Sequence, residues 1–147
     1  MAKMKVGVLL ILFFSMYIPV FSQLTISWDL LAEVNFDEKY VEKTDAYYLF
    51  PNFGAGPQEF KGKRVKLSGY MFPLDPEGDF YVLSKYPFSS CFFCGMAGPE
   101  SIVEIQFKGE NRKRYKMDEQ VTVTGILELN PDDIEHCNYI LIQAEEY

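Results

Sequence analysis

The chain has 147 residues, of which 48% are hydrophobic, a length that supports one packed domain and is too short for two. It carries 14 basic and 21 acidic side chains, a formal net charge of −7, and a single histidine. Because affinity for nucleic acid comes largely from neutralised phosphates, this charge argues against a nucleic-acid partner. A single histidine also excludes proton-transfer chemistry that needs several of them.

The first 22 residues have the pattern of a secretory signal peptide. Two lysines lie within residues 1–5, and residues 6–20 form an apolar run that contains Pro19. A transmembrane helix needs about 20 apolar residues, so this shorter, interrupted run favours cleavage, which we expect after Ser22. Cleavage removes two basic and no acidic residues, which leaves 12 basic and 21 acidic side chains and a net charge of −9. We therefore expect an exported protein, periplasmic or secreted, with no integral membrane segment after cleavage.

Residues 23–60 are expected to form an N-terminal helix and an extended arm that pack on the main domain. Residues 27–36 carry apolar side chains among acidic ones, which predicts a short amphipathic helix capped by Ser27. Residues 45–53 are rich in aromatic side chains and predict an extended segment. Residues 54–57, Gly-Ala-Gly-Pro, predict a turn or loop.

From Lys61 onward the hydrophobic pattern has a period of two, which indicates strands with one face directed inward. Residues 64–71 and 120–127 both show it, and each contains the motif Val-x-apolar-Ser/Thr-Gly. A glycine inside a strand usually marks a bulge or a sharp bend. Gly69 and Gly125 therefore predict two bent strands of a small, strongly coiled barrel.

Three further strands are predicted over residues 80–85, 101–107 and 139–144. Five strands, with the first and fourth bent, are typical of the OB-fold, a five-stranded Greek-key barrel. We therefore predict an all-β protein whose residues 61–147 form a small five-stranded OB-like barrel, preceded by a short N-terminal helix. The helix that usually connects the third and fourth strands is expected to be missing or reduced, because residues 109–119 are few and charged.

Two cysteines, Cys91 and Cys94, lie in the segment PFSSCFFCGMAGP between two predicted strands. A c-type haem attachment is excluded, because Gly95 occupies the position at which a histidine would bind the iron. A thioredoxin-like redox pair is disfavoured, because its first cysteine begins a helix, whereas here Gly98, Pro99 and a β pattern follow the cysteines. A plain disulfide between the two cysteines fits an exported protein and stays open as an interpretation.

The same pair can form half of a zinc site, because a Cys-x-x-Cys turn lets both thiolates face one ion. His136 and Cys137 are the candidates for the other half, so the predicted metal site consists of Cys91, Cys94, His136 and Cys137, with zinc as the ion. Neighbouring residues of a strand point to opposite faces, so His136 and Cys137 share an ion only if the chain turns there. If one of them faces the ion, His136 is the better candidate and Cys137 packs as a small apolar residue. The fourth position is then open or filled by one of Glu100, Asp132, Asp133 and Glu135.

The alternative hypothesis is a structural or interaction module without a metal. In it, a Cys91–Cys94 disulfide holds the barrel, and an aromatic face binds an exported partner protein or a small apolar ligand. The aromatic candidates for that face are Tyr70, Phe72, Tyr81, Phe92 and Phe93. An oxidoreductase partner that cycles the same cysteines is a third possibility. The sequence contains no P-loop, no Gly-x-Gly-x-x-Gly and no supported Ser-His-Asp arrangement, so we predict that the protein is not an enzyme.

Three stretches carry a resemblance to a known family: KGKRVKLSGYMFPLD, FYVLSKYPFSSCFFCGMAGPES and NPDDIEHCNYILIQAE. Over residues 26–147 the chain resembles a group of small exported bacterial proteins, known mainly from Bacteroidetes, that share a domain of unknown function. The resemblance implies export and an OB-like barrel. Distant periplasmic relatives, associated with metal-transport genes, carry a Cys and His arrangement in the segment that matches residues 81–94. This chain has a cysteine where they have histidine, so zinc handling by Cys91 and Cys94 is an expectation that the resemblance implies.

Overall fold

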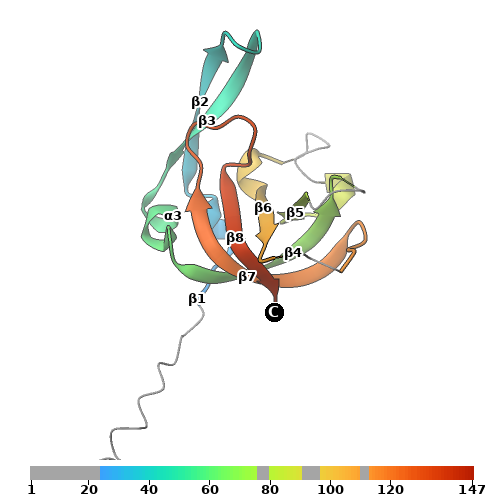
Figure 1. The fold of residues 1–147 in the computed structure, drawn as a ribbon. Helices are drawn as coiled ribbons and strands as arrows, with labels where there is room; N and C mark the ends of the chain where they lie inside the picture. Colours follow the sequence, from blue (N-terminus) through green and yellow to red (C-terminus); the bar gives the residue numbers. More distant parts are fainter. Residues whose placement is uncertain (1–23, 76–79, 91–96, 110–112) are drawn as a thin grey trace, which may run out of the picture.

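The computed structural model describes residues 24–75, 80–90, 97–109 and 113–147. The predicted signal peptide and the pair Cys91 and Cys94 lie outside these residues. Within them the chain forms eight β-strands, two short α-helices and two 3-10 turns (Figure 1). None of the helices found there has the length and apolar character needed to cross a membrane.

Five strands close into a barrel. These are β4 (Arg64–Pro73), β5 (Tyr81–Ser84), β6 (Ile102–Phe107), β7 (Glu119–Leu129) and β8 (Tyr139–Glu146). They are ordered β4-β5-β6-β8-β7, and β7 pairs back with β4, which completes the closure. Within this ring the β6–β8 pairing is parallel, and the other four strand pairings are antiparallel. The predicted all-β, OB-like small barrel is therefore confirmed.

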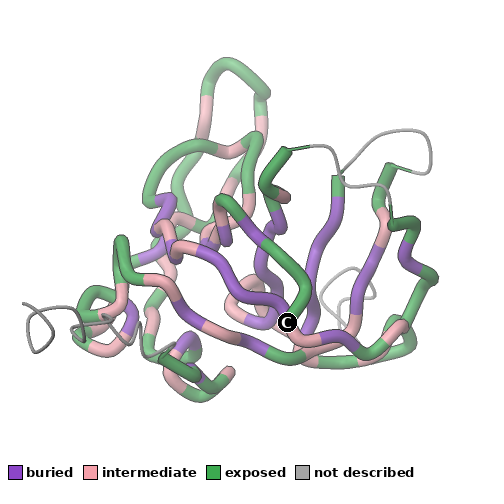
Figure 2. The backbone as a smooth tube through the Cα atoms, turned by 60° about the horizontal axis from the view of Figure 1, so that its bottom comes forward, coloured by how far each residue is buried: buried purple, intermediate pink, exposed green. Residues whose placement is uncertain are grey.

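Alternating burial explains why β4 and β7 form these strands. The inward positions predicted for β4, among them Val65, Leu67 and Met71, are buried, and the intervening residues are more exposed. Strand β5 differs, because all four of its residues are buried, and so are the first four residues of β6. Figure 2 shows that the buried residues gather along the barrel strands, whereas the protruding hairpin consists mainly of exposed and intermediate residues.

The two strand glycines occupy positions where the backbone approaches another strand closely. Opposite Gly125 the pairing of β7 with β8 shifts register, because two β8 residues, Gln143 and Ala144, lie between the partners of Thr124 and Ile126. The irregularity is therefore an extra residue in β8 that faces the glycine of β7. At Gly69 an added Cβ would lie 2.5 Å from the carbonyl oxygen of Ser84 in β5. Position 69 therefore requires glycine, because β4 and β5 approach each other too closely there for a Cβ atom.

The N-terminal helix begins where it was predicted and ends earlier. Helix α2 (Trp28–Leu31) follows Ser27, whose hydroxyl accepts a bond from the Leu30 amide at 3.3 Å. Leu31 is fully buried in the core, and the Trp28 indole donates to the Ser68 carbonyl at 2.8 Å. The short strand β1 (Leu24–Thr25) pairs with β4 in parallel. The helix prediction for residues 34–36 was wrong, because these residues pair as the start of a strand.

Strands β2 (Val34–Val41) and β3 (Ala46–Phe53) form an antiparallel hairpin that protrudes from the barrel (Figure 1). The extended segment predicted over residues 45–53 is β3, whereas the sequence did not predict its partner β2. The turn predicted for residues 54–57 was also wrong, because helix α3 (Ala55–Phe60) covers most of it. Pro57 is tolerated because the amides of the first helical turn have no intrahelical acceptor, so its missing N–H breaks no helical bond.

No helix of the kind usual in OB-folds is found in the described residues of the connection between β6 and β7. The structure describes residues 108–109 and 113–118 of this connection, and none of them is helical. The chain instead returns to the sheet through a turn at Asp118, which has a positive φ of 63°. This agrees with the prediction from the short, charged segment.

Candidate functional site

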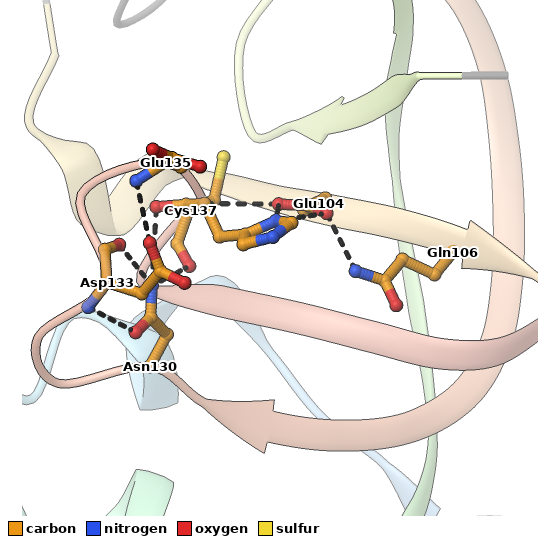
Figure 3. A network of polar contacts seen from close by, with 7 residues as sticks. Glu104, Gln106, Asn130, Asp133, Glu135 and Cys137 are labelled. Carbon is orange, nitrogen blue, oxygen red and sulfur yellow. Dashed lines mark hydrogen bonds and ion pairs between the residues drawn. The ribbon is translucent and has the colours of Figure 1, made fainter. Parts of the chain in front are cut away.

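A buried carboxylate lies at the centre of the candidate site. Strand β6 holds Glu104 between apolar neighbours, and its side chain is 2% exposed. The carboxylate lies 2.9 and 3.0 Å from His136 Nδ1 and accepts bonds from the Cys137 amide at 3.2 Å and the Gln106 side-chain amide at 2.8 Å (Figure 3). Because an unpaired buried charge is costly, these partners are what allow Glu104 to stay inside the barrel wall.

The β7–β8 loop brings His136 and Cys137 to that carboxylate. The side-chain amide of Asn130 donates to the Asp133 carbonyl at 2.7 Å and lies 3.3 and 3.2 Å from the carbonyls of His136 and Cys137. Its oxygen accepts from the Asp133 amide at 2.9 Å. One asparagine thus folds the loop into a compact turn (Figure 3). As a result His136 meets Glu104 through its ring, and Cys137 meets it through its backbone.

The geometry of His136 distinguishes its two ring nitrogens. Nδ1 faces the Glu104 carboxylate, so in the neutral ring Nδ1 carries the proton and Nε2 keeps its lone pair. The hydrogen bond to Glu104 and its negative charge raise the pKa of His136. The side chain is 43% exposed, so the ring is accessible from outside the barrel. Histidines that bind metals usually donate their other ring N–H to a carboxylate, which is the arrangement found here.

Cys137 has a different character. Burial, followed by the negative charge of Glu104, raises the pKa of its thiol to about 12. The metal ligand is the thiolate, so a metal must displace a firmly held proton at this position. Of the two candidate ligands in this loop, Cys137 is therefore the weaker one.

The raised pKa predicts slow chemistry at Cys137. In the Cys91→Ser/Cys94→Ser double variant, Cys137 is the one remaining thiol. We expect iodoacetamide at pH 8 to alkylate it about a thousandfold more slowly in the folded variant than in the denatured variant. The reason is that a thiol with a pKa of about 12 forms about a thousandfold less thiolate than one with a pKa near 9. Mass spectrometry of timed samples measures both rates, and equal rates would contradict the burial of this thiol.

Only part of the predicted metal site falls within the described residues. His136 and Cys137 lie together beside Glu104, while Cys91 and Cys94 are outside the part that the structure describes. Within the described ranges, no three His, Cys, Asp or Glu side chains are arranged to hold a metal ion. A ligand set that joins the loop to Cys91 and Cys94 therefore stays a prediction.

A cavity of about 440 Å³ lies beside this loop. His136 and Cys137 line it together with residues 47–51 of β3. The remaining lining residues are Leu74, Phe80, Pro99, Ile102, residues 131–135 and Asn138. Pro99 follows Cys94 by five positions, so the chain that leaves the Cys-x-x-Cys segment reaches the wall of the same cavity.

The aromatic lining of this cavity differs from the predicted aromatic face. Phe72 and Tyr81 were expected to line a concave face, but both are buried, and Tyr81 packs edge-on against Phe107 and Tyr115. Tyr70 accepts a bond from Gln120 and does not line the cavity, and residues 92–93 lie outside the described residues. The cavity aromatics are Tyr47, Tyr48, Phe50 and Phe80. The aromatic run in the predicted extended segment was the signal for three of them.

No family model, curated protein or solved structure matches the chain. The class of the protein is therefore defined by the fold and the site described above. It is a closed five-stranded, OB-like barrel in which the buried Glu104 carboxylate pairs with the partly exposed His136, and His136 lines an aromatic cavity.

Proposed function

We propose that this is an exported metal-binding protein whose zinc is held by Cys91, Cys94 and His136, with Cys137 as the candidate fourth ligand. One observation supports it most strongly: the buried Glu104 carboxylate engages Nδ1 of the sole histidine and leaves Nε2 available. Zinc favours nitrogen and sulfur ligands in a tetrahedral set, and two cysteines with one histidine supply three of them. Glu104 would act as a positioning residue, because its carboxylate contacts Nδ1 and leaves Nε2 for the ion.

The fourth position decides whether the site is closed or open. If a bound metal displaced the Cys137 proton into solvent, the set would be Cys₃His, which is typical of structural zinc. The high pKa of that thiol favours the other arrangement, in which the fourth position is open or filled by a carboxylate of the same loop. An open position is what a protein needs if it passes its metal to a partner.

Replacement of Glu104 by glutamine tests the positioning role. Glu104→Gln keeps the size of the side chain and removes its charge, and zinc affinity is expected to fall 10- to 100-fold, as is usual for the outer partner of a metal-binding histidine. In the metal-free protein the pKa of His136 should also fall, because the carboxylate that raises it is gone. Competition with a chelating dye measures the affinity, and NMR titration of the single histidine measures the pKa.

The matched control is Glu38→Gln, which removes one exposed carboxylate from strand β2, outside the site. It should leave both the zinc affinity and the pKa of His136 unchanged. If Glu104→Gln lowers the pKa but zinc binds as tightly as before, Glu104 pairs with His136 without serving a metal, and the proposal loses its main support.

A further inference from the structure

The cavity beside the β7–β8 loop runs along one edge of the protruding hairpin. Five consecutive residues of β3, residues 47–51, line it, although side chains of a strand alternate between its two faces. The cavity therefore follows the edge of the strand. No residue of β2 lines it, and among the described strands β3 pairs only with β2. Within the part of the chain that the structure describes, the edge of β3 that borders the cavity is thus open for pairing.

Large apolar side chains are exposed on the same strand. Tyr47 is 67% and Leu49 49% exposed, and both line the cavity with Tyr48, Phe50 and Phe80. The hairpin thus exposes large apolar side chains to solvent although its own pairing does not require them. Exposed apolar surface of this kind, bordered by polar residues, is typical of a protein interaction site.

The part of the cavity lining that the β7–β8 loop supplies is acidic. It contains Asp132, Asp133 and Glu135, and among the described residues that line the cavity there is no lysine or arginine. Lys43 in the hairpin turn lies 3.8 Å from Glu135, so it offsets that charge. The two aspartates are exposed, and Asp133 also accepts a bond from the Glu135 amide at 2.9 Å. Aromatic faces beside carboxylates attract the ammonium or guanidinium group of a basic side chain.

We propose that this cavity binds an extended, basic segment of a partner protein. The segment adds a strand to the open edge of β3, so main-chain hydrogen bonds supply affinity. Its lysine or arginine side chains enter between the aromatic rings and the two aspartates, which supplies specificity. The overall charge of −7 attracts such a partner as well. This interaction goes beyond the proposed metal binding and does not depend on it.

Fluorescence anisotropy with a labelled octapeptide that alternates valine and arginine tests the proposal. The peptide should bind, and one that alternates valine and glutamate should not. Asp132→Asn/Asp133→Asn should weaken binding at least tenfold. The matched control Glu38→Gln/Glu59→Gln removes the same charge outside the cavity and should change affinity less than twofold. Equal binding of both peptides, or equal effects of both double variants, would overturn the proposal.

Two further measurements test strand addition and independence from the metal. N-methylation of alternate residues of the arginine peptide, on the edge that faces β3, should weaken binding at least tenfold, and unchanged binding would refute strand addition. The Cys91→Ser/Cys94→Ser variant should bind the peptide as the unmodified chain does. If it does not, the cavity depends on the cysteine segment and the proposed independence is wrong, whereas failure of the zinc proposal leaves this result intact.

Discussion

Replacement of Gly69 by alanine is expected to lower the free energy of unfolding by about 3 kcal/mol, at the upper end of what overpacking usually costs. The added Cβ would lie 2.5 Å from the Ser84 carbonyl oxygen and 3.0 Å from both a Leu83 carbon and a Trp28 ring carbon. The oxygen belongs to the backbone of β5, which pairs with β4, so it cannot move without disturbing that pairing. Urea unfolding followed by fluorescence of the single tryptophan measures the loss.

The control for this prediction is Gly109→Ala. A Cβ at Gly109 would meet nothing within 4 Å, but the residue has a positive φ of 68°, so alanine there costs about 1 kcal/mol through backbone conformation alone. The effect at Gly69 should clearly exceed this value. If Gly69→Ala is within 0.5 kcal/mol of the unmodified chain, in the range of ordinary surface substitutions, the close approach of β4 and β5 is not present in solution.

The second large effect is expected for Cys91→Ser. If Cys91 is a zinc ligand, the variant should lose stoichiometric zinc and melt on the order of 10 °C lower than the zinc-loaded chain. The estimate follows because a hundredfold excess of free zinc over its Kd stabilises the folded state by about 2.7 kcal/mol, and about 1 kcal/mol shifts Tm by roughly 4 °C at this chain length. Elemental analysis and calorimetry of the same sample measure both quantities.

Ser90→Ala is the matched control, because it changes the residue next to Cys91 and removes no thiol. It should retain zinc and the melting temperature. Stoichiometric zinc in Cys91→Ser would show that this cysteine is not a ligand. A lowered Tm in a variant that had no zinc to lose would instead point to a disulfide.

The barrel strands were predictable because their chemistry is local. Buried and exposed positions alternate because one face of the sheet is directed to the core. This alternation located the ends of β4 and β7 to within two residues. Gly125 predicted a bulge or a bend because glycine inside a strand has few other uses, and the irregularity that the structure has at this point is an extra residue of β8 opposite the glycine.

The hairpin was only half predictable, for a physical reason. Strand β2 protrudes from the barrel, and five of its eight residues are exposed. Its apolar alternation begins at Val34 and Phe36 but is interrupted by the charged residues 37–39, so the pattern does not mark a strand. The extended conformation of β2 depends on its pairing with β3, and a local sequence pattern does not reveal such a pairing. Helix α3 was missed because Gly56 and Pro57 are turn residues by composition, and their tolerance depends on their place in the first helical turn.

Some residues of the candidate site could likewise be predicted from the sequence, and others could not. His136 and Cys137 stood out by residue type, whereas Glu104 was missed because nothing in its neighbours connects it to a loop 32 residues later. A signal did exist: Glu104 interrupts the apolar run Ile-Val-Glu-Ile of a strand that is buried on both faces. A carboxylate in such a position is rarely left without a partner. The turn that lets His136 and Cys137 meet one group comes from Asn130, whose role only the folded loop reveals.

The most direct test of the zinc proposal is elemental analysis of the mature protein, purified without chelators or affinity metals, together with a count of thiols after denaturation and chelation. About one zinc per chain and three free thiols is the predicted result. No metal and a single thiol would contradict the proposal, because that outcome means a Cys91–Cys94 disulfide and leaves the aromatic cavity as the functional part of the molecule.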